Sequence, residues 1–262
     1  MDYSNQPIIE LAQEAARKAG QIIVDCSKKQ IVSNKSSHNL VTNADYSAQE
    51  KIIETIKERF SDHHFIAEEN QVTSHYNAEN LWIIDPLDGT NNYAHNIPHF
   101  SVSIAYARRG RIEAGAVLDP LRNEMFTAET GRGAFLNGVP ITVSASKALQ
   151  QSIIATGFYY DRGLLMKKTL KSIEKLFECN VHGIRRFGSA ALDLCWVACG
   201  RFDAYFEYKL SPWDFAAGML IVNEAGGHCT NSSNNSLDLN SEGIVASNKL
   251  LHNSLIKIVS PA

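Results

Sequence analysis

The chain has 262 residues, of which 44% are hydrophobic and 20% are charged. These proportions are ordinary for a globular protein, and they exclude a largely disordered chain, a collagen-like fibre and a coiled coil. The net charge of −3 argues against a general nucleic-acid binder, because such proteins neutralise phosphates with an excess of Lys and Arg.

Two helices open the N-terminal half. Apolar residues recur at helical spacing over residues 8–23, with charged residues between them, which predicts an amphipathic helix. A polar stretch covers 28–39, and a second helix is predicted over 43–60. Thr42 is placed to cap this second helix, and Asp45 lies in its first turn, where a carboxylate is favourable.

Strands dominate the rest of this half. Short apolar runs at 65–66 and 81–84 predict two strands. Segments 100–106, 112–118 and 124–128 follow, with turn residues between them. This pattern predicts a meander of antiparallel strands.

The pattern changes near residue 150, where strand and helix begin to alternate. Strands are predicted at 153–155, 183–187, 202–206 and around Val245, and helices at 164–177, 189–199, 212–224 and 249–258. No linker-like segment separates the two halves. We therefore expect an α/β protein with one domain over residues 1–262, built from an α+β half (1–145) and an α/β half (146–262).

The cysteines and the start of the chain indicate the compartment. The five cysteines are widely spaced and form no Cys-x-x-Cys motif, which favours buried reduced thiols. The first 20 residues lack the basic and apolar segments of a signal peptide, and no apolar run reaches the ~18 residues of a membrane span. We expect a cytoplasmic protein without membrane contact.

The most informative segment covers residues 82–93 (WIIDPLDGTNNY). An apolar strand leads into Asp85, and Gly89 permits a tight turn. The carboxylates of Asp85 and Asp88 can then converge, with the Leu87 carbonyl between them. Such hard oxygen ligands suit Mg²⁺, although the motif taken alone also fits an ordinary surface turn.

Two further acidic residues strengthen the metal interpretation. Glu68 follows an apolar strand, so a carboxylate again lies at a strand end. Asp214 lies in the first turn of a helix that Pro212 opens. Each also fits a simpler role, Glu68 as a solvated charge and Asp214 as a helix-stabilising residue.

Together these segments resemble the inositol monophosphatase family of metal-dependent sugar-phosphate phosphatases. The similar segments stand in the family's order, at 40–45 (LVTNAD), 67–69 (AEE), 82–93, 188–191 (GSAA) and 213–227 (WDFAAGMLIVNEAGG). The resemblance implies a layered αβαβα sandwich of the type shared with fructose bisphosphatase, with the active site between the two halves. One departure is Ala67, where the family usually has Gly; we expect its methyl group to alter the backbone only slightly.

The resemblance implies a site for about two to three Mg²⁺ ions. Glu68, Asp85 and the Leu87 carbonyl match the ligands of a first ion. Asp85, Asp88 and Asp214 match those of a second. Glu68, with water, matches part of a weaker third position.

The resemblance also implies catalytic and substrate-binding residues. Asp45 and Thr90 match the pair that orients the attacking water, with Glu68 as a third catalytic residue. Backbone amides near Gly89 and Thr90 match the phosphate-binding groups. The remaining matches are the substrate wall, Gly188, Ser189, Ala190 and Glu207, and a basic residue of an entrance loop, Lys35.

The implied activity is Mg²⁺-dependent hydrolysis of myo-inositol 1-phosphate by a metal-activated water, in a lithium-sensitive homodimer. Four clustered carboxylates would repel a phosphate dianion, so the chemistry requires the metal first. Related substrates remain open, namely fructose 1,6-bisphosphate, histidinol phosphate and nucleotide phosphates, because their enzymes share the metal motifs. Glu207 favours a polyol over a second phosphate, whereas Arg185 and Arg186 suit a distal phosphate, a subunit contact or a solvated surface equally.

An alternative from another class is a binding role. Some bacterial members of the family act in RNA synthesis through protein and RNA contacts, and the segments at 189–194 and 212–218 resemble bacterial members most. The intact acidic set indicates that catalysis is retained, and it leaves room for such a second role.

Overall fold

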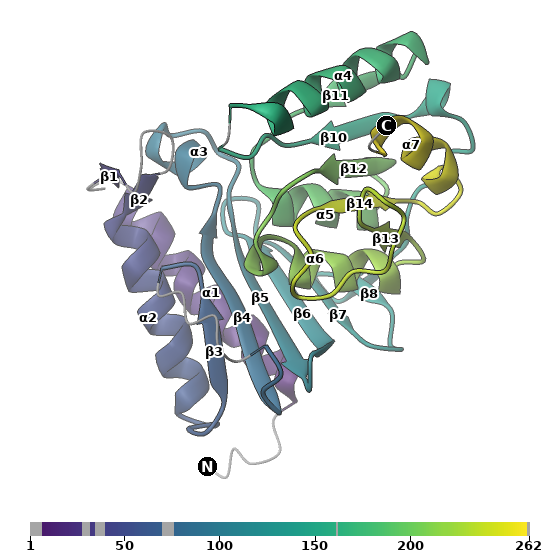
Figure 1. Ribbon diagram of the computed structural model, residues 1–262. Helices are drawn as coiled ribbons and strands as arrows, with labels where there is room; N and C mark the ends of the chain where they lie inside the picture. The colour runs from purple at the N-terminus through teal and green to yellow at the C-terminus, as the bar shows by residue number, and fades with distance from the viewer. Residues whose placement is uncertain (1–6, 28–31, 35–39, 70–75, 161, 261–262) are drawn as a thin grey trace.

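The computed structural model describes residues 7–27, 32–34, 40–69, 76–160 and 162–260. In this part of the chain two β-sheets alternate with layers of helices (Figure 1). Among the described residues, every helix is too short or too polar to span a lipid bilayer.

The larger sheet has seven strands in the order β3-β4-β5-β6-β7-β8-β9. The strands are β3 (His64–Ala67), β4 (Asn80–Asp88), β5 (Ser101–Arg108), β6 (Arg111–Asp119), β7 (Glu124–Glu129), β8 (Ala134–Leu136) and β9 (Val139–Ile141). The predicted antiparallel meander is confirmed from β4 onward. It is wrong for β3, which pairs with β4 in parallel, so the carboxyl ends of both strands lie at one edge.

Helices cover both faces of this sheet because neighbouring strand residues point to opposite sides. Trp82 and Ile84 pack in one core with α1 (Ile8–Cys26) and α2 (Asn43–Lys57). Ile83, between them, packs in a second core with the helices of the C-terminal half. A near-continuous apolar run in β4 therefore reflects a strand that is buried on both faces.

The smaller sheet has five strands in the order β11-β10-β12-β14-β13. The strands are β10 (Ile153–Thr156), β11 (Gly183–Arg185), β12 (Ala204–Glu207), β13 (His228–Thr230) and β14 (Ile244–Ser247). Strand β10 is parallel to β11 and β12, whereas β14 runs antiparallel to β12 and β13.

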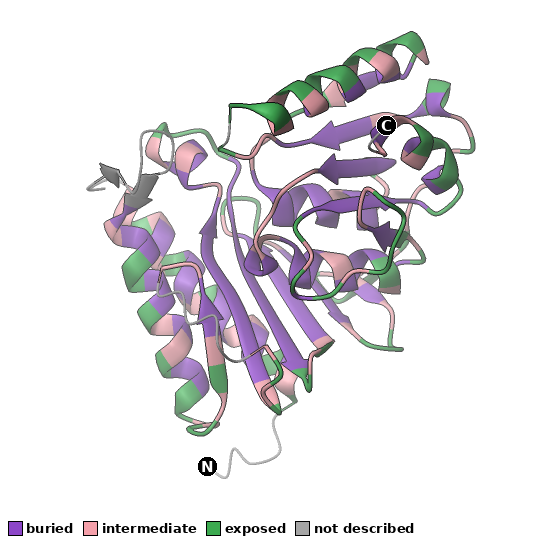
Figure 2. Ribbon diagram, viewed as in Figure 1, coloured by how far each residue is buried: buried purple, intermediate pink, exposed green. Residues whose placement is uncertain are grey.

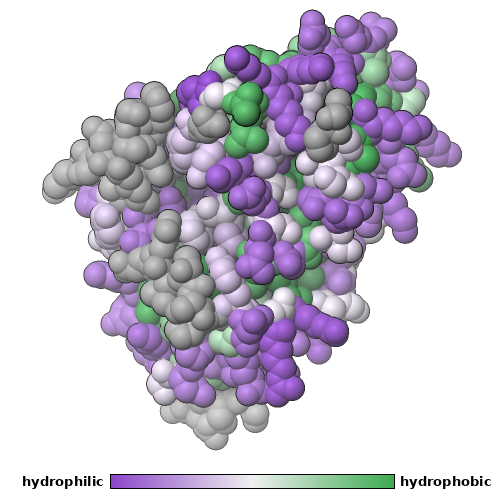
Figure 3. Space-filling view, viewed as in Figure 1, coloured by the Kyte–Doolittle hydropathy of each residue, from purple (hydrophilic) through white to green (hydrophobic). Residues whose placement is uncertain are grey.

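Helices α5 (Ala190–Ala198) and α6 (Pro212–Glu224) lie between the two sheets. Helices α4 (Leu164–Glu178) and α7 (His252–Val259) cover the outer face of the smaller sheet. The layers therefore follow the predicted αβαβα order. Figure 2 shows the strands buried over most of their length, with the outward faces of α2 and α4 exposed. Hydrophilic side chains cover much of the face in Figure 3, with smaller hydrophobic groups between them.

The small elements not predicted from the sequence are the hairpin of β1 (Val32–Asn34) and β2 (Leu40–Thr42), the short helix α3 (Thr90–Ala94), and strands β8 and β13. A 3-10 turn over Leu149–Gln151 precedes β10. Each of these elements spans three to five residues, which is too short for a helical or alternating period to stand out.

The end of β4 also differs from the prediction. The strand continues through Pro86 to Asp88 instead of ending at Asp85. Asp85 pairs with Ser103 and Asp88 with Ser101, so β4 has one residue more than β5 between these pairs. This β-bulge re-aims side chains, so Asp85 and Asp88 converge where a regular strand would send them to opposite faces.

Candidate active site

A cavity of about 530 Å³ is lined by residues of both halves of the chain. Its lining includes the acidic residues Glu68, Asp85, Asp88 and Asp214, and also residues 188–190 with Glu207. The cavity thus lies where the active site is expected, between the two halves.

Three aspartates form the centre of the acidic side. Carboxylate oxygens of Asp85, Asp88 and Asp214 all lie within 4.8 Å of one another. Asp214 is the third residue of α6, and its Oδ2 accepts a hydrogen bond of 2.6 Å from the Ser211 amide at the helix cap. Glu68 follows β3 directly, and its charge acts on all three aspartates.

The environment of these three aspartates strongly disfavours their ionised form. Burial, followed by repulsion from neighbouring carboxylates, raises the pKa of Asp85 and of Asp214 well above the usual range. Burial raises the pKa of Asp88 to about 6, although hydrogen bonds from Ser189 and the Ala191 amide oppose the shift.

Among the described residues, none of the three aspartates forms an ion pair with Lys or Arg. Buried carboxylates without a compensating charge are costly. Their oxygen-only donor set and close convergence fit a hard divalent cation such as Mg²⁺.

Asp45 and Thr90 meet beside this cluster. Thr90 Oγ1 lies 3.0 Å from Asp45 Oδ1 and 3.0 Å from the Leu87 carbonyl, and it can donate to either. Asp45 Oδ2 accepts hydrogen bonds from the backbone amide and the hydroxyl of Thr42, which caps α2. Burial raises the pKa of Asp45, while the bonds from Thr42 oppose this. The structure thus brings together two residues separated by 45 positions.

A turn at Gly89 aims the end of β4 into the cavity. Gly89 has a φ of 97°, and a Cβ there would lie 3.1 Å from the His99 carbonyl oxygen, so only glycine suits this position. Hydrogen bonds from Asn92 stabilise this turn. Its side-chain amide donates to the carbonyls of His99 and Phe187, at 2.7 Å each.

The start of α5 joins the substrate wall to the acidic cluster. Ser189 Oγ donates a 2.6 Å hydrogen bond to Asp88 Oδ2, and the Ala191 amide donates a 2.8 Å bond to the same oxygen. Gly188, with a φ of 89°, and Ala190 also line the cavity. The wall therefore positions an acidic residue as well as lining the cavity, a link that the sequence did not predict.

Glu207 lies in the wall at the end of β12 and is buried. Its Oε2 accepts a 2.6 Å hydrogen bond from the Tyr205 hydroxyl. The carboxylate packs against Gly157, where any Cβ would lie 1.8 Å from Oε2. Burial raises the pKa of Glu207 to about 7, opposed by the Tyr205 bond and the charge of Arg186. Glu207 is thus a packed, pocket-lining acid and not a solvated charge.

Proteins of similar sequence and structure show to which family the chain belongs. The profile of the inositol monophosphatase family matches residues 4–262. The chain belongs to the inositol monophosphatase family. A relative from Haemophilus influenzae, named Nus factor SuhB, is 43% identical over 256 residues, which is 96% of each chain.

Solved structures agree with this membership. The extragenic suppressor protein suhB from Bartonella henselae matches with a TM-score of 0.91 and 36% identity, over 96% of this chain and 98% of that one. The Thermotoga maritima IMPase matches with a TM-score of 0.88 and 36% identity, over 95% of each chain. The predicted family and fold class are confirmed, and family membership identifies the protein as a phosphatase.

The departure from the inositol monophosphatase pattern at Ala67 is accommodated within the core. Ala67 is 3% exposed and packs in the same core as α1 and α2. It keeps its strand pairing with Ile84, and the next residue, Glu68, donates its amide to the Ile84 carbonyl at 3.2 Å.

Other residues of the site were missed or lie outside the structure. Arg186 lines the cavity, whereas Arg185 is exposed and donates to the Ile184 carbonyl. Lys35 lies outside the described residues. The lining residues to which the sequence assigned no role are Tyr46, Glu69, Asn91, Asn92, Gly157, Phe158, Tyr159, Tyr160, Asp193, Tyr205, Leu210, Ser211 and Trp213. Asp193 did carry a signal, as the one charged residue of the apolar helix AALDLCWVA.

Proposed function

We propose that the protein hydrolyses myo-inositol 1-phosphate to inositol and phosphate with Mg²⁺ as cofactor. The observation that carries the proposal is the convergence of Asp85, Asp88 and Asp214 at the β4 bulge, beside the Asp45–Thr90 pair. A buried acidic cluster of this kind suits a dianionic substrate only when cations bind with it.

In this proposal, residues that line the cavity hold the Mg²⁺ ions. Glu68, Asp85 and the Leu87 carbonyl would hold a first Mg²⁺. Asp85, Asp88 and Asp214 would hold a second, and Glu68 with water would hold part of a weaker third. When bound, Mg²⁺ supplies positive charge for the phosphate and the leaving oxygen, and it lowers the pKa of a coordinated water.

Asp45 and Thr90 orient the attacking water. Because the Thr90 hydroxyl donates its hydrogen to Asp45, its oxygen lone pairs are free to accept a hydrogen from that water. Glu68 accepts the other hydrogen, so the water directs a lone pair at the phosphorus atom. No side chain needs to act as a covalent nucleophile.

The remaining residues hold the substrate. Backbone amides near Gly89 and Thr90 bind phosphate oxygens, and residues 188–190 with Glu207 face the leaving group. Glu207 accepts hydrogen bonds from polyol hydroxyls, which favours inositol over a leaving group that carries a second phosphate.

The test is phosphate release from a panel of substrates, with Mg²⁺ and with excess chelator. We expect the highest kcat/KM for myo-inositol 1-phosphate, above fructose 1,6-bisphosphate, histidinol phosphate and nucleotide phosphates. We expect chelation to abolish activity. Full activity in chelator contradicts the metal mechanism. A higher kcat/KM for another ester would show that this ester, and not myo-inositol 1-phosphate, is the preferred substrate.

Further properties belong to the same proposal. We expect one cooperative domain over residues 1–262, a homodimer in the cytoplasm, inhibition by lithium, and an entrance loop that contains Lys35. Light scattering tests the dimer, and a single calorimetric transition tests the domain. Residual activity in rising LiCl, with KCl as the control salt, tests lithium sensitivity.

A second candidate function is a binding role in RNA synthesis. The name of the Haemophilus influenzae relative, Nus factor SuhB, supports it. Its test is a pull-down at physiological salt with wild type and with Asp85→Asn. A transcription-linked partner retained by both forms supports a binding role independent of catalysis, and no such partner with either form contradicts it.

A further inference from the structure

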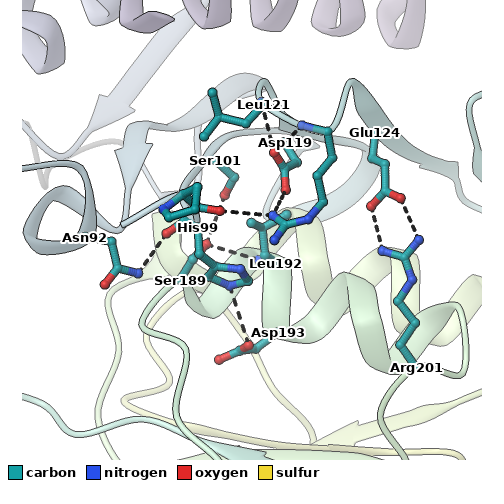
Figure 4. Close-up of polar contacts among 12 residues, drawn as sticks. Asn92, His99, Ser101, Asp119, Leu121, Glu124, Ser189, Leu192, Asp193 and Arg201 are labelled. Atoms are coloured by element: carbon teal, nitrogen blue, oxygen red, sulfur yellow. Dashed lines mark hydrogen bonds and ion pairs between the residues drawn. The ribbon is translucent and has the colours of Figure 1, made fainter. Parts of the chain in front are cut away.

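A buried polar pair lies directly behind the substrate wall and has no part in the proposed mechanism. Asp193, in the first turn of α5, is 1% exposed, and His99 is 4% exposed. Figure 4 shows one carboxylate oxygen of Asp193 pointing toward His99 and the other pointing away from it.

Three polar side-chain atoms of the pair have no hydrogen bond among the described residues. Asp193 Oδ1 lies 3.9 Å from His99 Nε2, which is too far for a hydrogen bond. Among the described residues, neither this oxygen nor either ring nitrogen of His99 has a hydrogen-bond partner. The His99 ring is held by aromatic contacts with Phe187 and Trp196, at 5.0 and 5.3 Å between ring centroids.

Such an arrangement does not serve stability. A buried carboxyl group with an unpartnered oxygen costs free energy, and an apolar side chain of similar volume is often neutral or better. Asp193 is therefore not explained by a contribution to the stability of this apolar helix. Its second carboxylate oxygen points away from His99 (Figure 4), and this is the oxygen that a ligand would contact.

Asp193 lines the candidate active-site cavity together with Glu207 and Arg186. The charges of Asp88, Glu207 and Arg186 all act on Asp193. Glu207 and Arg186 likewise interact with each other. Two carboxyl groups and one guanidinium thus share the part of the cavity beyond the phosphate-binding turn.

We propose that Asp193 is a specificity-determining residue that binds a hydroxyl group of the leaving group, next to the hydroxyl bound by Glu207. The two acids come from α5 and β12, so they can accept hydrogen bonds from two adjacent hydroxyls. Arg186, which has only donors, can bond to the oxygens of the same hydroxyls. The inference rests on the proposed phosphatase function and adds a second hydroxyl contact to its recognition of the leaving group.

The test compares Asp193→Asn and Asp193→Leu on two substrates in Mg²⁺. With myo-inositol 1-phosphate we expect kcat/KM to fall about tenfold, mainly through KM, because a hydrogen bond to the substrate is lost. With phenyl phosphate, which has no hydroxyls, we expect a change below about twofold. We expect no fall in melting temperature for Asp193→Asn, since it keeps the size of the side chain and removes an unpartnered acid.

Asp203→Asn is the matched control. Asp203 is also a buried aspartate, 7% exposed, but it lies outside the cavity and bonds to the Ser144 hydroxyl and the Ile153 amide. We expect it to lower the melting temperature and to affect both substrates equally. Equal losses on both substrates for the Asp193 variants, or no loss, overturn the inference.

Calorimetric binding of myo-inositol separates this inference from the proposed function. Weaker binding in both Asp193 variants, with wild-type-like binding in Asp203→Asn, supports the hydroxyl site even where turnover is absent. Unchanged binding overturns it. Absence of turnover by wild type on both substrates overturns the phosphatase proposal only.

Discussion

At the scale of single residues, Asp85 is the carboxylate on which both proposed metal positions depend. Asp85→Asn should lower turnover by at least ~10³-fold, because it removes a charge shared by two ions. Phosphate release under saturating substrate measures the effect. Asp25→Asn, an exposed change near the end of α1, is the control and should keep full activity. An Asp85→Asn enzyme within tenfold of wild type would contradict the ligand assignment.

Glu207 tests the substrate wall in a different way. Glu207→Ala should lower kcat/KM for myo-inositol 1-phosphate by roughly 10–100-fold, the value of a hydrogen bond to a charged acceptor. Mg²⁺ affinity should hardly change, because Glu207 lies outside the cluster of three aspartates. Small phosphates without a polyol ring should lose little. Kinetics on both substrate types decide the role, and equal losses would remove Glu207 from substrate recognition.

At the scale of elements, the start of α2 couples helix stability to the site. Thr42 Oγ1 accepts from the Ala44 amide and donates to Asp45 Oδ2. Thr42→Val should therefore destabilise the protein by about 1 kcal/mol, as loss of a helix cap does. It should also lower kcat, because Asp45 loses a partner that holds it toward Thr90. Urea unfolding and turnover measure the two effects.

The same helix offers a matched control. Thr55 is fully buried, and its hydroxyl has no hydrogen-bond partner among the described residues. Thr55→Val should leave stability unchanged or raise it, since it removes an unsatisfied polar group. Equal behaviour of the two valine variants would show that the cap is not what stabilises α2.

The contact between α5 and α6 is a second test at this scale. A Cβ at Gly218 would lie 2.7 Å from the Cβ of Leu194, so α5 would have to shift. Gly218→Ala should cost about 1–3 kcal/mol through overpacking, against a helix-propensity gain of about 1 kcal/mol. Turnover should fall as well, because the start of α5 holds Asp88 through Ser189. A net gain of stability in urea unfolding would show that α5 has room to move.

At the scale of the whole molecule, the acidic site makes stability depend on pH and Mg²⁺. Burial raises the pKa of Asp88 from 3.8 to about 6 and that of Glu207 from 4.5 to about 7. The folded protein therefore keeps protons that the unfolded chain releases. Without metal, stability should be full below about pH 4 and should fall as the pH rises through 6 and 7.

Mg²⁺ should reverse this loss. A ligand at 100 times its dissociation constant stabilises the folded state by about 2.7 kcal/mol. The rise in melting temperature should be larger at pH 8 than at pH 5.5, because metal binding at low pH must displace protons. Calorimetry at both pH values, with and without chelator, measures it. An equal shift at both pH values would contradict the raised pKa values.

The sequence by itself determined the family, the major helices and strands, and the acidic residues of the site. These depend on local information: the amphipathic periods of α1 and α2, the apolar run of β4, and motifs such as 82–93. The cap at Thr42 is equally local, because the residues it joins lie within one turn of α2.

The tertiary structure decided how these elements meet. The parallel pairing of β3 with β4 places Glu68 beside Asp85, and the bulge opposite β5 turns Asp88 toward the same point. Ser189 holds Asp88 across 101 positions of sequence. The burial of Glu207 and the cavity position of Asp193 likewise arise from packing between layers. Contacts between residues so far apart leave no local periodicity, so only the folded chain shows them.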